Sequence, residues 1–170
     1  GIKLPKHDYY CFHDVDLVPQ SAFNNYLYPT FDPTVAIHLT TALTKDKFML
    51  PYKTLVGGAI LLTKESYSLM NGFSNAYWGW GGEDDDFEAR FKQHNLSYRH
   101  LPQDIGSYCN LRHLSSDTHG EFEDTPVEKK IIQARNGRIL IFRQKNKIPT
   151  SKDGLLQTKY SVVDVEVHDA

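Results

Sequence analysis

Short apolar runs separated by polar stretches recur along this chain of 170 residues. Runs rich in branched and aromatic side chains are typical of β-strands, and they predict strands at residues 9–18, 34–39, 59–63, 96–101, 107–111, 138–142 and 159–167. We interpret the first run, which ends at Pro19, as a buried strand that carries Asp14 and Asp16 at its C-terminal end. A chain of this length fits one domain with a sizeable core.

Three segments have the spacing of helices, and they cover residues 64–70, 84–94 and 128–134. In the second segment, Phe87 and Phe91 are four residues apart and therefore share one face of the helix. This helix begins within an acidic run, where the helix dipole favours negative charge. The polar and acidic stretch 114–128 predicts a long loop, and long loops in compact domains are often lids.

Composition and charge narrow the functional classes. Lys and Arg number 19 and Asp and Glu 21, so the net charge is −2, and no basic stripe indicates nucleic-acid binding. The mean hydropathy is −0.48, and no apolar run approaches the roughly 20 residues of a spanning helix, so we expect no membrane segment in this chain. Cys11 is expected to be a buried small apolar residue, and it could bridge to Cys109 only if their strands adjoin.

Residues 76–86 hold the densest cluster of chemistry in the chain. Trp78 and Trp80 are followed by two glycines and by four consecutive carboxylates at 83–86. Acids at a helix start can simply cap the helix and face solvent, but that interpretation leaves the aromatic residues and glycines unexplained. Large aromatics beside bare backbone offer a surface on which a sugar ring can stack. A carboxylate held in a partly dry pocket can act as a general base, so the segment predicts a site that holds a sugar and removes a proton from it.

Asp14-Val15-Asp16 is a second candidate. Residues i and i+2 of a strand point to the same side, so the two carboxylates would form a hard-oxygen site suited to Mg²⁺ or Mn²⁺. Such a metal can bridge a diphosphate and stabilise it as a leaving group. An Asp-x-Asp by itself is more often a solvated turn, and the apolar run before it is what favours the metal site.

His113 and Gly57-Gly58 each have a structural and a functional interpretation. A single His after an apolar strand is usually a structural residue, and it becomes a metal ligand only if it folds back onto Asp16. Two glycines before a strand are most simply a bulge or a turn. The functional alternative is that their backbone approaches a phosphate or a sugar closely.

The order of these pieces resembles the catalytic C-terminal half of the β-1,4-galactosyltransferases, which form glycosyltransferase family 7. The residues that carry the resemblance are His-Asp-Val-Asp-Leu-Val-Pro at 13–19, Tyr-Lys-Thr-Leu-Val-Gly-Gly at 52–58, Asn-Gly-Phe-Ser-Asn at 71–75, Trp-Gly-Trp-Gly-Gly-Glu-Asp-Asp-Asp at 78–86, Leu-Arg-His at 111–113 and Asp-Gly-Leu-Leu-Gln-Thr-Lys-Tyr at 153–160. The nearest branch is the xylosylprotein 4-β-galactosyltransferases, which add galactose to xylose in the proteoglycan linker region.

The resemblance implies an α/β fold of the GT-A type, a mixed sheet with flanking helices, with residues 1–170 forming a single domain that corresponds to the C-terminal half of the full fold. It also implies an enzyme, a metal-dependent inverting hexosyltransferase. Galactose or GalNAc would move from a UDP-sugar donor to a hydroxyl of a saccharide or glycoconjugate acceptor in β-1,4 linkage. The implied cofactor is Mn²⁺, with Mg²⁺ as the alternative. The implied compartment is the Golgi lumen for a membrane-anchored eukaryotic parent, and otherwise the cytoplasm.

Site roles also follow from the resemblance. Asp84 is implied to be the catalytic base, and Asp16 and His113 the metal ligands. The donor and acceptor sugars are implied to contact Asp14, Leu55, Gly58, Trp80, Glu83 and Asp85. The loop after His113 would be a lid over donor and metal.

The chain departs from the family pattern in three places. Leu55 stands where galactose-using members commonly carry Tyr, and a smaller side chain leaves room for a substituent at C2 of the donor sugar. Ser115 stands where the branch often has a second His. Asn110 lies three residues before His113, and its amide oxygen is a hard ligand, which leaves the metal preference open.

Only thirteen residues precede Asp14, whereas the uridine-binding part of a GT-A fold comes before this motif. We therefore expect either a fragment of a longer chain or a reduced protein whose donor site something else completes. The alternative function is a non-catalytic carbohydrate-binding or scaffold module derived from such a domain. A transferase of a related class, such as a polypeptide GalNAc-transferase or a chondroitin polymerase module, is the third hypothesis.

Overall fold

The computed structural model describes residues 9–27, 32, 34–111, 126–146 and 149–158. In chain order its elements are β1 (Tyr9–His13), β2 (Leu17–Pro19), β3 (Val35–His38), β4 (Ala42–Leu43), η1 (Thr44–Asp46), β5 (Ala59–Thr63), α1 (Lys64–Leu69), α2 (Glu83–Gln93), β6 (Ser97–His100), β7 (Ser107–Asn110), α3 (Pro126–Asn146), η2 (Thr150–Lys152) and η3 (Leu155–Gln157). The mixture of strands and helices confirms the α/β class.

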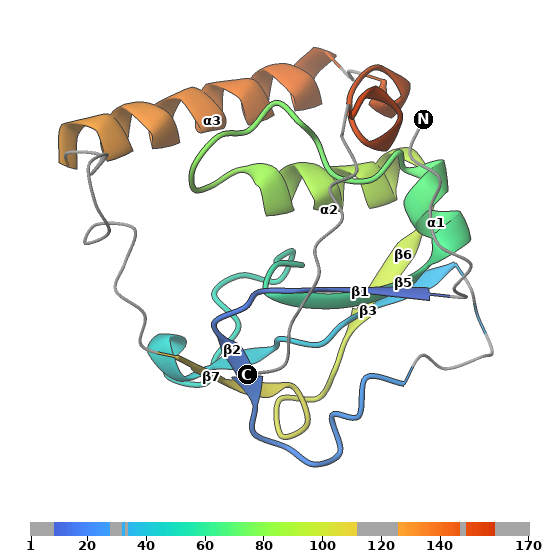
Figure 1. Ribbon diagram of the computed structural model, residues 1–170, viewed down its shortest axis with the longest axis vertical. Helices are drawn as coiled ribbons and strands as arrows, with labels where there is room; N and C mark the ends of the chain where they lie inside the picture. The colour runs from blue at the N-terminus through green and yellow to red at the C-terminus, as the bar shows by residue number, and fades with distance from the viewer. Residues whose placement is uncertain (1–8, 28–31, 33, 112–125, 147–148, 159–170) are drawn as a thin grey trace, which may run out of the picture.

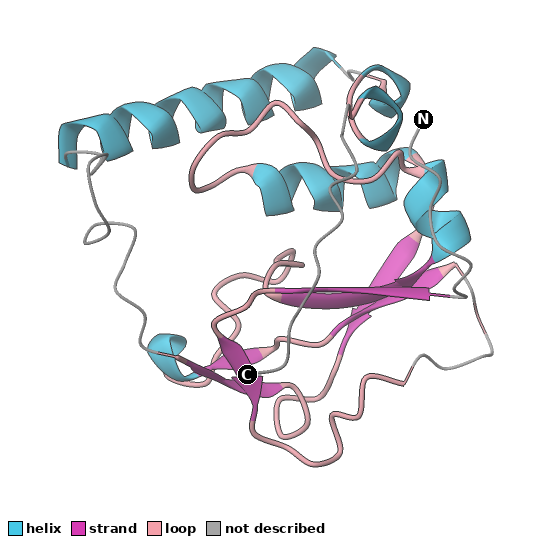
Figure 2. Cartoon of the chain, viewed as in Figure 1, coloured by secondary structure: helices cyan, strands magenta, loops and turns pink. Residues whose placement is uncertain are grey.

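Two small sheets form the base of the molecule. The larger has the strand order β1-β5-β3-β6, in which β3 and β6 are parallel and the other neighbours are antiparallel. The smaller has the order β2-β7-β4, with β2 antiparallel and β4 parallel to β7. Figure 1 shows α2 above the larger sheet and α3 outermost, beyond α2. The helices therefore cover one side of the larger sheet (Figure 2).

Strand β5 organises the core because all five of its residues are buried. Since successive side chains of a strand point to opposite faces, they enter two separate apolar clusters. Ile60 and Leu62 pack with Phe87 and Phe91 of α2 on the helix side. On the other face, Ala59 and Leu61 join the cluster that contains Leu17, Ile37, Leu39, Leu43 and Tyr108. The predicted pairing of Phe87 and Phe91 on one helix face is confirmed.

A buried ion network fixes α3 against α2. The Asp86 carboxylate accepts from Nε of Arg90 at 3.0 Å and from Nε of Arg143 at 2.8 Å. Arg143 also pairs with Asp153 at 3.0 Å, so one side chain of α3 binds both α2 and the segment after η2. Asp86 and Arg90 are buried and Arg143 and Asp153 are partly buried, and each charge has an opposite charge beside it, which is the condition for a favourable ion pair away from water.

Most predicted elements are confirmed: strands at 34–39, 59–63, 96–101 and 107–111 and helices at 64–70 and 84–94 match β3, β5, β6, β7, α1 and α2 within two residues. The predicted strand at 159–167 lies outside the described residues, and so does the predicted loop at 114–128 as far as residue 125; residues 126–128 of that loop belong instead to the first turn of α3. None of the described helices is long and apolar enough to cross a membrane.

Three expectations were wrong. The run 9–18 is two strands with a turn at residues 14–16 between them, and β1 is a half-exposed edge strand rather than a buried one. Cys11 is accordingly exposed, and it lies in a different sheet from Cys109; both are free thiols.

The predicted strand at 138–142 is part of α3. Ile132, Asn136 and Arg143 recur at helical spacing and contact the tryptophan loop and α2, so they set a helical period that continues past Gly137. Ile141 and Phe142 are exposed, and the β-propensity of this run is overridden by these contacts.

The ion network predicts a contrast between two methionine substitutions. Arg143→Met removes from Asp86 and Asp153 a cation whose side chain is only 11% exposed. We expect the free energy of unfolding to fall by about 2–4 kcal/mol. Lys92→Met removes a cation that is 67% exposed from Glu88, and we expect a loss below about 1 kcal/mol. Urea denaturation measures both. Equal losses of unfolding free energy in the two variants would contradict the role of the ion network in holding α3 against α2.

Candidate active site

A cavity of about 600 Å³ opens between the two sheets, the tryptophan loop and α3. Its lining residues include members of three segments that the sequence marked as chemical: the Asp14–Asp16 turn, the segment that ends in Gly57 and Gly58, and the tryptophan and acid segment. The lining residues are Asp14, Asp16, Leu17, Leu43, Asp46, Pro51, Tyr52, Leu55, Gly57, Gly58, Trp80, Gly81, Gly82, Asp84, Asp85, Asn110, Gln133, Gly137 and Leu140. Seven of the predicted site residues therefore meet in one place: Asp14, Asp16, Leu55, Gly58, Trp80, Asp84 and Asp85.

Asp14 and Asp16 reach the cavity from the turn between β1 and β2. The Asp14 amide donates to the Gly58 carbonyl at 2.7 Å, and the Leu111 amide donates to the Asp16 carbonyl at 2.7 Å. These bonds tie the turn to β5 on one side and to β7 on the other. The predicted strand geometry is wrong here, but the predicted outcome, two carboxylates at one site, is what the turn produces.

Glycine has a different role at each of positions 57 and 58. Gly58 has φ = 88°, in the left-handed region, and a side chain there would press on Thr40 and Leu17. A methyl group on Gly57 would overlap the carboxylate of Asp84, so this carboxylate packs directly on the bare backbone. The two glycines therefore form a turn before β5, as the structural interpretation expected, and they also leave room for the Asp84 side chain; the approach of their backbone to a phosphate or a sugar stays a prediction.

Asp84 is the most perturbed carboxyl group of the cavity. Burial, together with the negative charges of Glu83, Asp14 and Asp85, raises its pKa from the ordinary 3.8 to about 7. The coupling to Asp14 shows that the acidic start of α2 and the turn after β1 face each other. A carboxyl group with a pKa near neutrality and partial access to a cavity has the properties of a general base.

The four consecutive acids of α2 have four different environments. Asp84 and Asp85 line the cavity, and Asp85 accepts a hydrogen bond from the Tyr52 hydroxyl at 3.0 Å. Asp86 points away into the ion network. Glu83 does not line the cavity, and its Oε2 is buried without a hydrogen-bond partner among the described atoms. The run is therefore part site and part scaffold.

The tryptophan loop is held in place by α3. The side-chain amide of Asn136, which is 1% exposed, donates to the carbonyls of Trp78 at 2.9 Å and Trp80 at 3.4 Å. Both indole rings remain about three-quarters exposed, and of the two only Trp80 lines the cavity. A wide aromatic face beside a cavity that also holds the carboxylates of Asp84 and Asp85 is suited to stacking against an apolar face of a sugar ring.

Hard oxygen donors gather at the end of the cavity near β7. Asn110 lines it from the end of β7, Asp16 lines it from the turn just before the neighbouring strand β2, and Asp46 lines it from η1 with a buried Oδ2 that has no described partner. Such a donor set fits Mg²⁺ or Mn²⁺. Across the residues that the structure describes, no three His, Cys, Asp or Glu side chains form a ready metal cluster, and the predicted ligand His113 lies outside them.

Sequence reasoning missed the contribution of α3 and of Asp46. One wall of the cavity is formed by residues of α3 at helical spacing, Gln133, Gly137 and Leu140. The prediction of a strand at 138–142 did not allow these residues to share a helix face. Helical periodicity extended from residue 128 to 146 was the signal that could have found it. Asp46 carries no motif, and only the fold brings it to Asn110.

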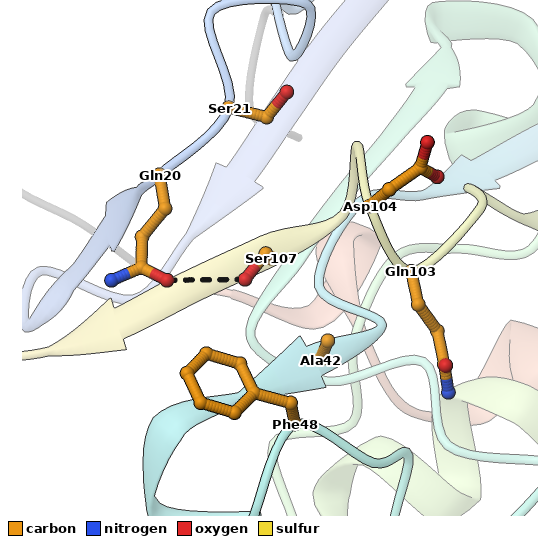
Figure 3. A pocket seen from close by; sticks show the side chains of 7 residues that line it. All are labelled: Gln20, Ser21, Ala42, Phe48, Gln103, Asp104 and Ser107. Carbon is orange, nitrogen blue, oxygen red and sulfur yellow. Dashed lines mark hydrogen bonds between the residues drawn. The ribbon is translucent and has the colours of Figure 1, made fainter.

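A second cavity, of about 470 Å³, lies on the outer side of the smaller sheet (Figure 3). Gln20 and Ser107 are hydrogen bonded across it at 3.1 Å, and Asp104 is the one ionisable residue among those that line it. It contains none of the predicted site residues. We therefore assign the chemistry to the larger cavity.

The chain is similar in sequence to known galactosyltransferases. A family model described as the N-terminal domain of galactosyltransferase matches residues 37–114. β-1,4-Galactosyltransferase 4 of Mus musculus is 33% identical over 98% of this chain and 43% of its own length. β-1,4-Galactosyltransferase 3 of Homo sapiens is 41% identical over 59% of this chain and 25% of its own. This chain is a relative of the β-1,4-galactosyltransferases.

Solved structures agree on the fold. The catalytic domain of Drosophila β-1,4-galactosyltransferase 7 in complex with xylobiose matches with a TM-score of 0.65 at 25% identity, covering 94% of this chain and 61% of that one. A mutant of that enzyme in complex with manganese, UDP-Gal and xylobiose matches with a TM-score of 0.64. The GT-A-type fold and the resemblance to glycosyltransferase family 7 are confirmed. The chain spans less than half the length of the curated relatives, and which part of them it corresponds to stays a prediction.

The raised pKa of Asp84 predicts how its replacement changes stability. Because the folded-state pKa lies above the ordinary 3.8, ionisation of Asp84 opposes folding, and this penalty grows as pH rises from about 4 to about 7 and is constant above it. We expect Asp84→Asn to raise the Tm progressively over this interval relative to the unsubstituted protein. Calorimetry at several pH values measures the difference, with Asp104→Asn, which removes an exposed carboxylate outside this cavity, as the control. If the Tm difference between Asp84→Asn and the unsubstituted protein did not change with pH, the raised pKa of Asp84 would be refuted.

Proposed function

We propose that this chain carries the catalytic site of a metal-dependent inverting glycosyltransferase. It would move galactose, or GalNAc, from a UDP-sugar to a hydroxyl group of a saccharide acceptor and form a β-1,4 linkage. The observation that supports this most is the meeting of a near-neutral carboxyl group, Asp84, with the Asp14–Asp16 turn in one cavity beside Trp80. An inverting transfer needs a base on the acceptor side and a site for the diphosphate leaving group, and the two acidic segments offer both.

In this proposal Asp84 takes the proton from the acceptor hydroxyl while the hydroxyl oxygen attacks C1 of the donor sugar. The C1–O bond to UDP breaks on the opposite face, so the configuration at C1 inverts. The raised pKa makes the Asp84 carboxylate a stronger base than an ordinary aspartate, and contact with Gly57 fixes its direction. Asp16 and His113 would hold a divalent cation, with Asn110 and Asp46 as further oxygen donors lining the cavity, and the cation would supply charge neutralisation at the diphosphate.

The remaining predicted residues have positioning roles. Trp80 provides the stacking surface for the acceptor, and Asp85, braced by the Tyr52 hydroxyl, accepts hydrogen bonds from sugar hydroxyls. Asp14 contacts the nucleotide-sugar, and the Gly58 backbone approaches the donor. Glu83, which lies beside the cavity, holds a sugar once substrate is bound. The acceptor class that the Drosophila complexes suggest is a xyloside, since those complexes contain xylobiose.

The wider assignments belong to the same proposal. Residues 1–170 would be a single catalytic domain of the C-terminal type, active in the Golgi lumen if the parent protein is a membrane-anchored eukaryotic enzyme. UDP-sugar and saccharide acceptor are the proposed partners. The β-1,4 linkage and the choice between galactose and GalNAc rest on the resemblance and on Leu55.

The base assignment predicts the kinetics of Asp84→Asn. The amide keeps the shape of the side chain but cannot accept the proton, so we expect transfer to fall about 100- to 10,000-fold while the affinity for UDP-galactose stays within about threefold. Transfer of radiolabelled galactose to xyloside and N-acetylglucosaminide acceptors measures the rate, and titration of UDP-galactose measures the affinity. Undiminished transfer in this variant would remove Asp84 from the role of base.

The contact between Gly57 and Asp84 predicts a non-additive pair of substitutions. Gly57→Ala displaces the carboxylate, and we expect a loss of roughly 100-fold in kcat, the effect of moving a catalytic group by about 1 Å. Gly57→Ala combined with Asp84→Asn should lose no more than Asp84→Asn alone, because both act on the same group. A multiplicative loss in the double variant would show that Gly57 acts through something other than Asp84.

The size of the side chain at position 55 is expected to set the preference between UDP-galactose and UDP-GalNAc. Leu55 lines the cavity, and replacing it with the larger Tyr should fill the space beside C2 of the donor sugar. We expect Leu55→Tyr to lower kcat/KM for UDP-GalNAc relative to UDP-galactose by about 10- to 100-fold. Competition between the two donors, with products separated by mass, measures the ratio. An unchanged ratio would exclude Leu55 from the donor pocket.

A further inference from the structure

A buried pair of histidines lies behind the cavity wall and has no role in the chemistry described above. His38 of β3 and His100 of β6 are aligned across the parallel pair of strands, and their Nδ1 atoms are 2.8 Å apart. His38 is completely buried and His100 partly so. The two rings meet edge to face, with their centroids 4.9 Å apart.

The hydrogen bonds of the pair require one proton more than two neutral rings carry. Nε2 of His38 lies 2.7 Å from the Gly57 carbonyl, and Nε2 of His100 lies 2.9 Å from the Lys53 carbonyl. A carbonyl only accepts, so both Nε2 atoms must carry hydrogen. The Nδ1–Nδ1 bond needs a third hydrogen. Two neutral imidazoles have two N–H groups between them, and only a pair with a net charge of +1 makes all three bonds.

The two carbonyls delimit one wall of the cavity. Lys53 and Gly57 bracket the segment that contains Leu55, and Gly57 carries the packed Asp84 carboxylate on its other side. The pair thus binds both ends of a five-residue segment from behind, whereas Leu55 and Asp84 meet the cavity in front. A change in the number of hydrogen bonds to these carbonyls acts on the segment directly.

Other ionisable groups surround the pair at a greater remove. Tyr98, two residues before His100 on the same strand, stacks edge-on against its ring, and its hydroxyl donates to Glu88 of α2. Arg99 points to the opposite face of the sheet with Ile37 and Leu39, beside a separate cavity. Asp84 lies beyond Gly57. Among the described ionisable side chains in this region, His38 and His100 are the ones that hydrogen bond to each other and to the carbonyls of Gly57 and Lys53.

We propose that His38 and His100 form a proton-operated clamp on residues 53–57: the protonated pair fixes both ends of the segment, and the neutral pair releases one. Burial lowers the pKa of His38 to about 4, which favours the neutral form of its ring in the pair. A neutral His38 donates through Nε2 to the Gly57 carbonyl and accepts at Nδ1. Loss of the proton leaves two N–H groups for three hydrogen bonds, and in this proposal the bond that is lost is one of the two to the carbonyls. The consequence for transfer rests on the proposed function, but the clamp itself does not.

Nuclear magnetic resonance of the full chain tests the clamp without any substrate. The background variant is Asp84→Asn, so that titration of this carboxyl group cannot contribute to the signal from Gly57. The ¹⁵N resonances of the imidazole rings count the nitrogens without hydrogen, and the amide ¹⁵N resonances of Thr54 and Gly58 report on the carbonyls of Lys53 and Gly57. We expect one ring nitrogen without hydrogen at low pH and two at high pH within about pH 5–8, the interval in which histidines change charge. Thr54 and Gly58 should shift on the same curve.

His100→Gln in the same background provides the matched comparison, because its amide donates at every pH. We expect the pH-dependent shifts of Thr54 and Gly58 to be lost in His100→Gln and retained in His94→Gln, where a histidine bonded to Thr150 is removed elsewhere. Two ring nitrogens without hydrogen throughout the interval would overturn the proposal even if His100→Gln fails to fold. So would shifts of Thr54 and Gly58 that persist in a folded His100→Gln. Failure of UDP-galactose to bind would count against the proposed function and leave the clamp standing.

Discussion

The packing of the Asp84 carboxylate on the backbone of Gly57 is the contact that the rest of the candidate site depends on. It holds an acidic group in a partly dry cavity against three other negative charges, and this costs free energy of folding that the surrounding structure must offset. The gain is a carboxyl group whose pKa lies near neutrality and whose direction is fixed. A strained group of this kind, maintained by its surroundings, is what a general base requires.

The surroundings that maintain it are specific. Helix α2 is anchored by Phe87 and Phe91 in the core and by Asp86 in the ion network with Arg143. Helix α3, fastened by that network, in turn holds the tryptophan loop through Asn136. The Asp84 carboxylate, the Trp80 ring and the cavity wall formed by α3 are therefore held in place by the same set of contacts. On the other side, backbone bonds from Asp14 and Asp16 to β5 and β7 fix the turn that faces Asp84.

Several residues that line the cavity were predictable from the sequence, and much of the cavity's construction was not. Local chemistry marked Asp14, Asp16 and the 78–86 segment because glycines, aromatics and clustered acids are unusual together. The split of the acidic run into cavity residues and the buried Asp86 depends on which helix face meets α3, and that is a tertiary property. Likewise, Asn136 and the histidine pair carry no local signal, since an Asn in a helix and two His 62 residues apart become informative only when the strands are aligned. The strand predicted at 138–142 failed for the same reason: its neighbours, rather than its own side chains, determine that it is helical.

The central claim is that one cavity of this chain binds a nucleotide-sugar through a divalent cation and presents Asp84 to an acceptor. Calorimetric titration of UDP-galactose into the full chain, with and without Mn²⁺ and with Asp16→Ala in parallel, tests it most directly. The account predicts saturable binding that requires Mn²⁺ and is lost in Asp16→Ala. Binding of an acceptor saccharide with no response to UDP-galactose or to the metal would contradict it and identify the chain as a carbohydrate-binding module.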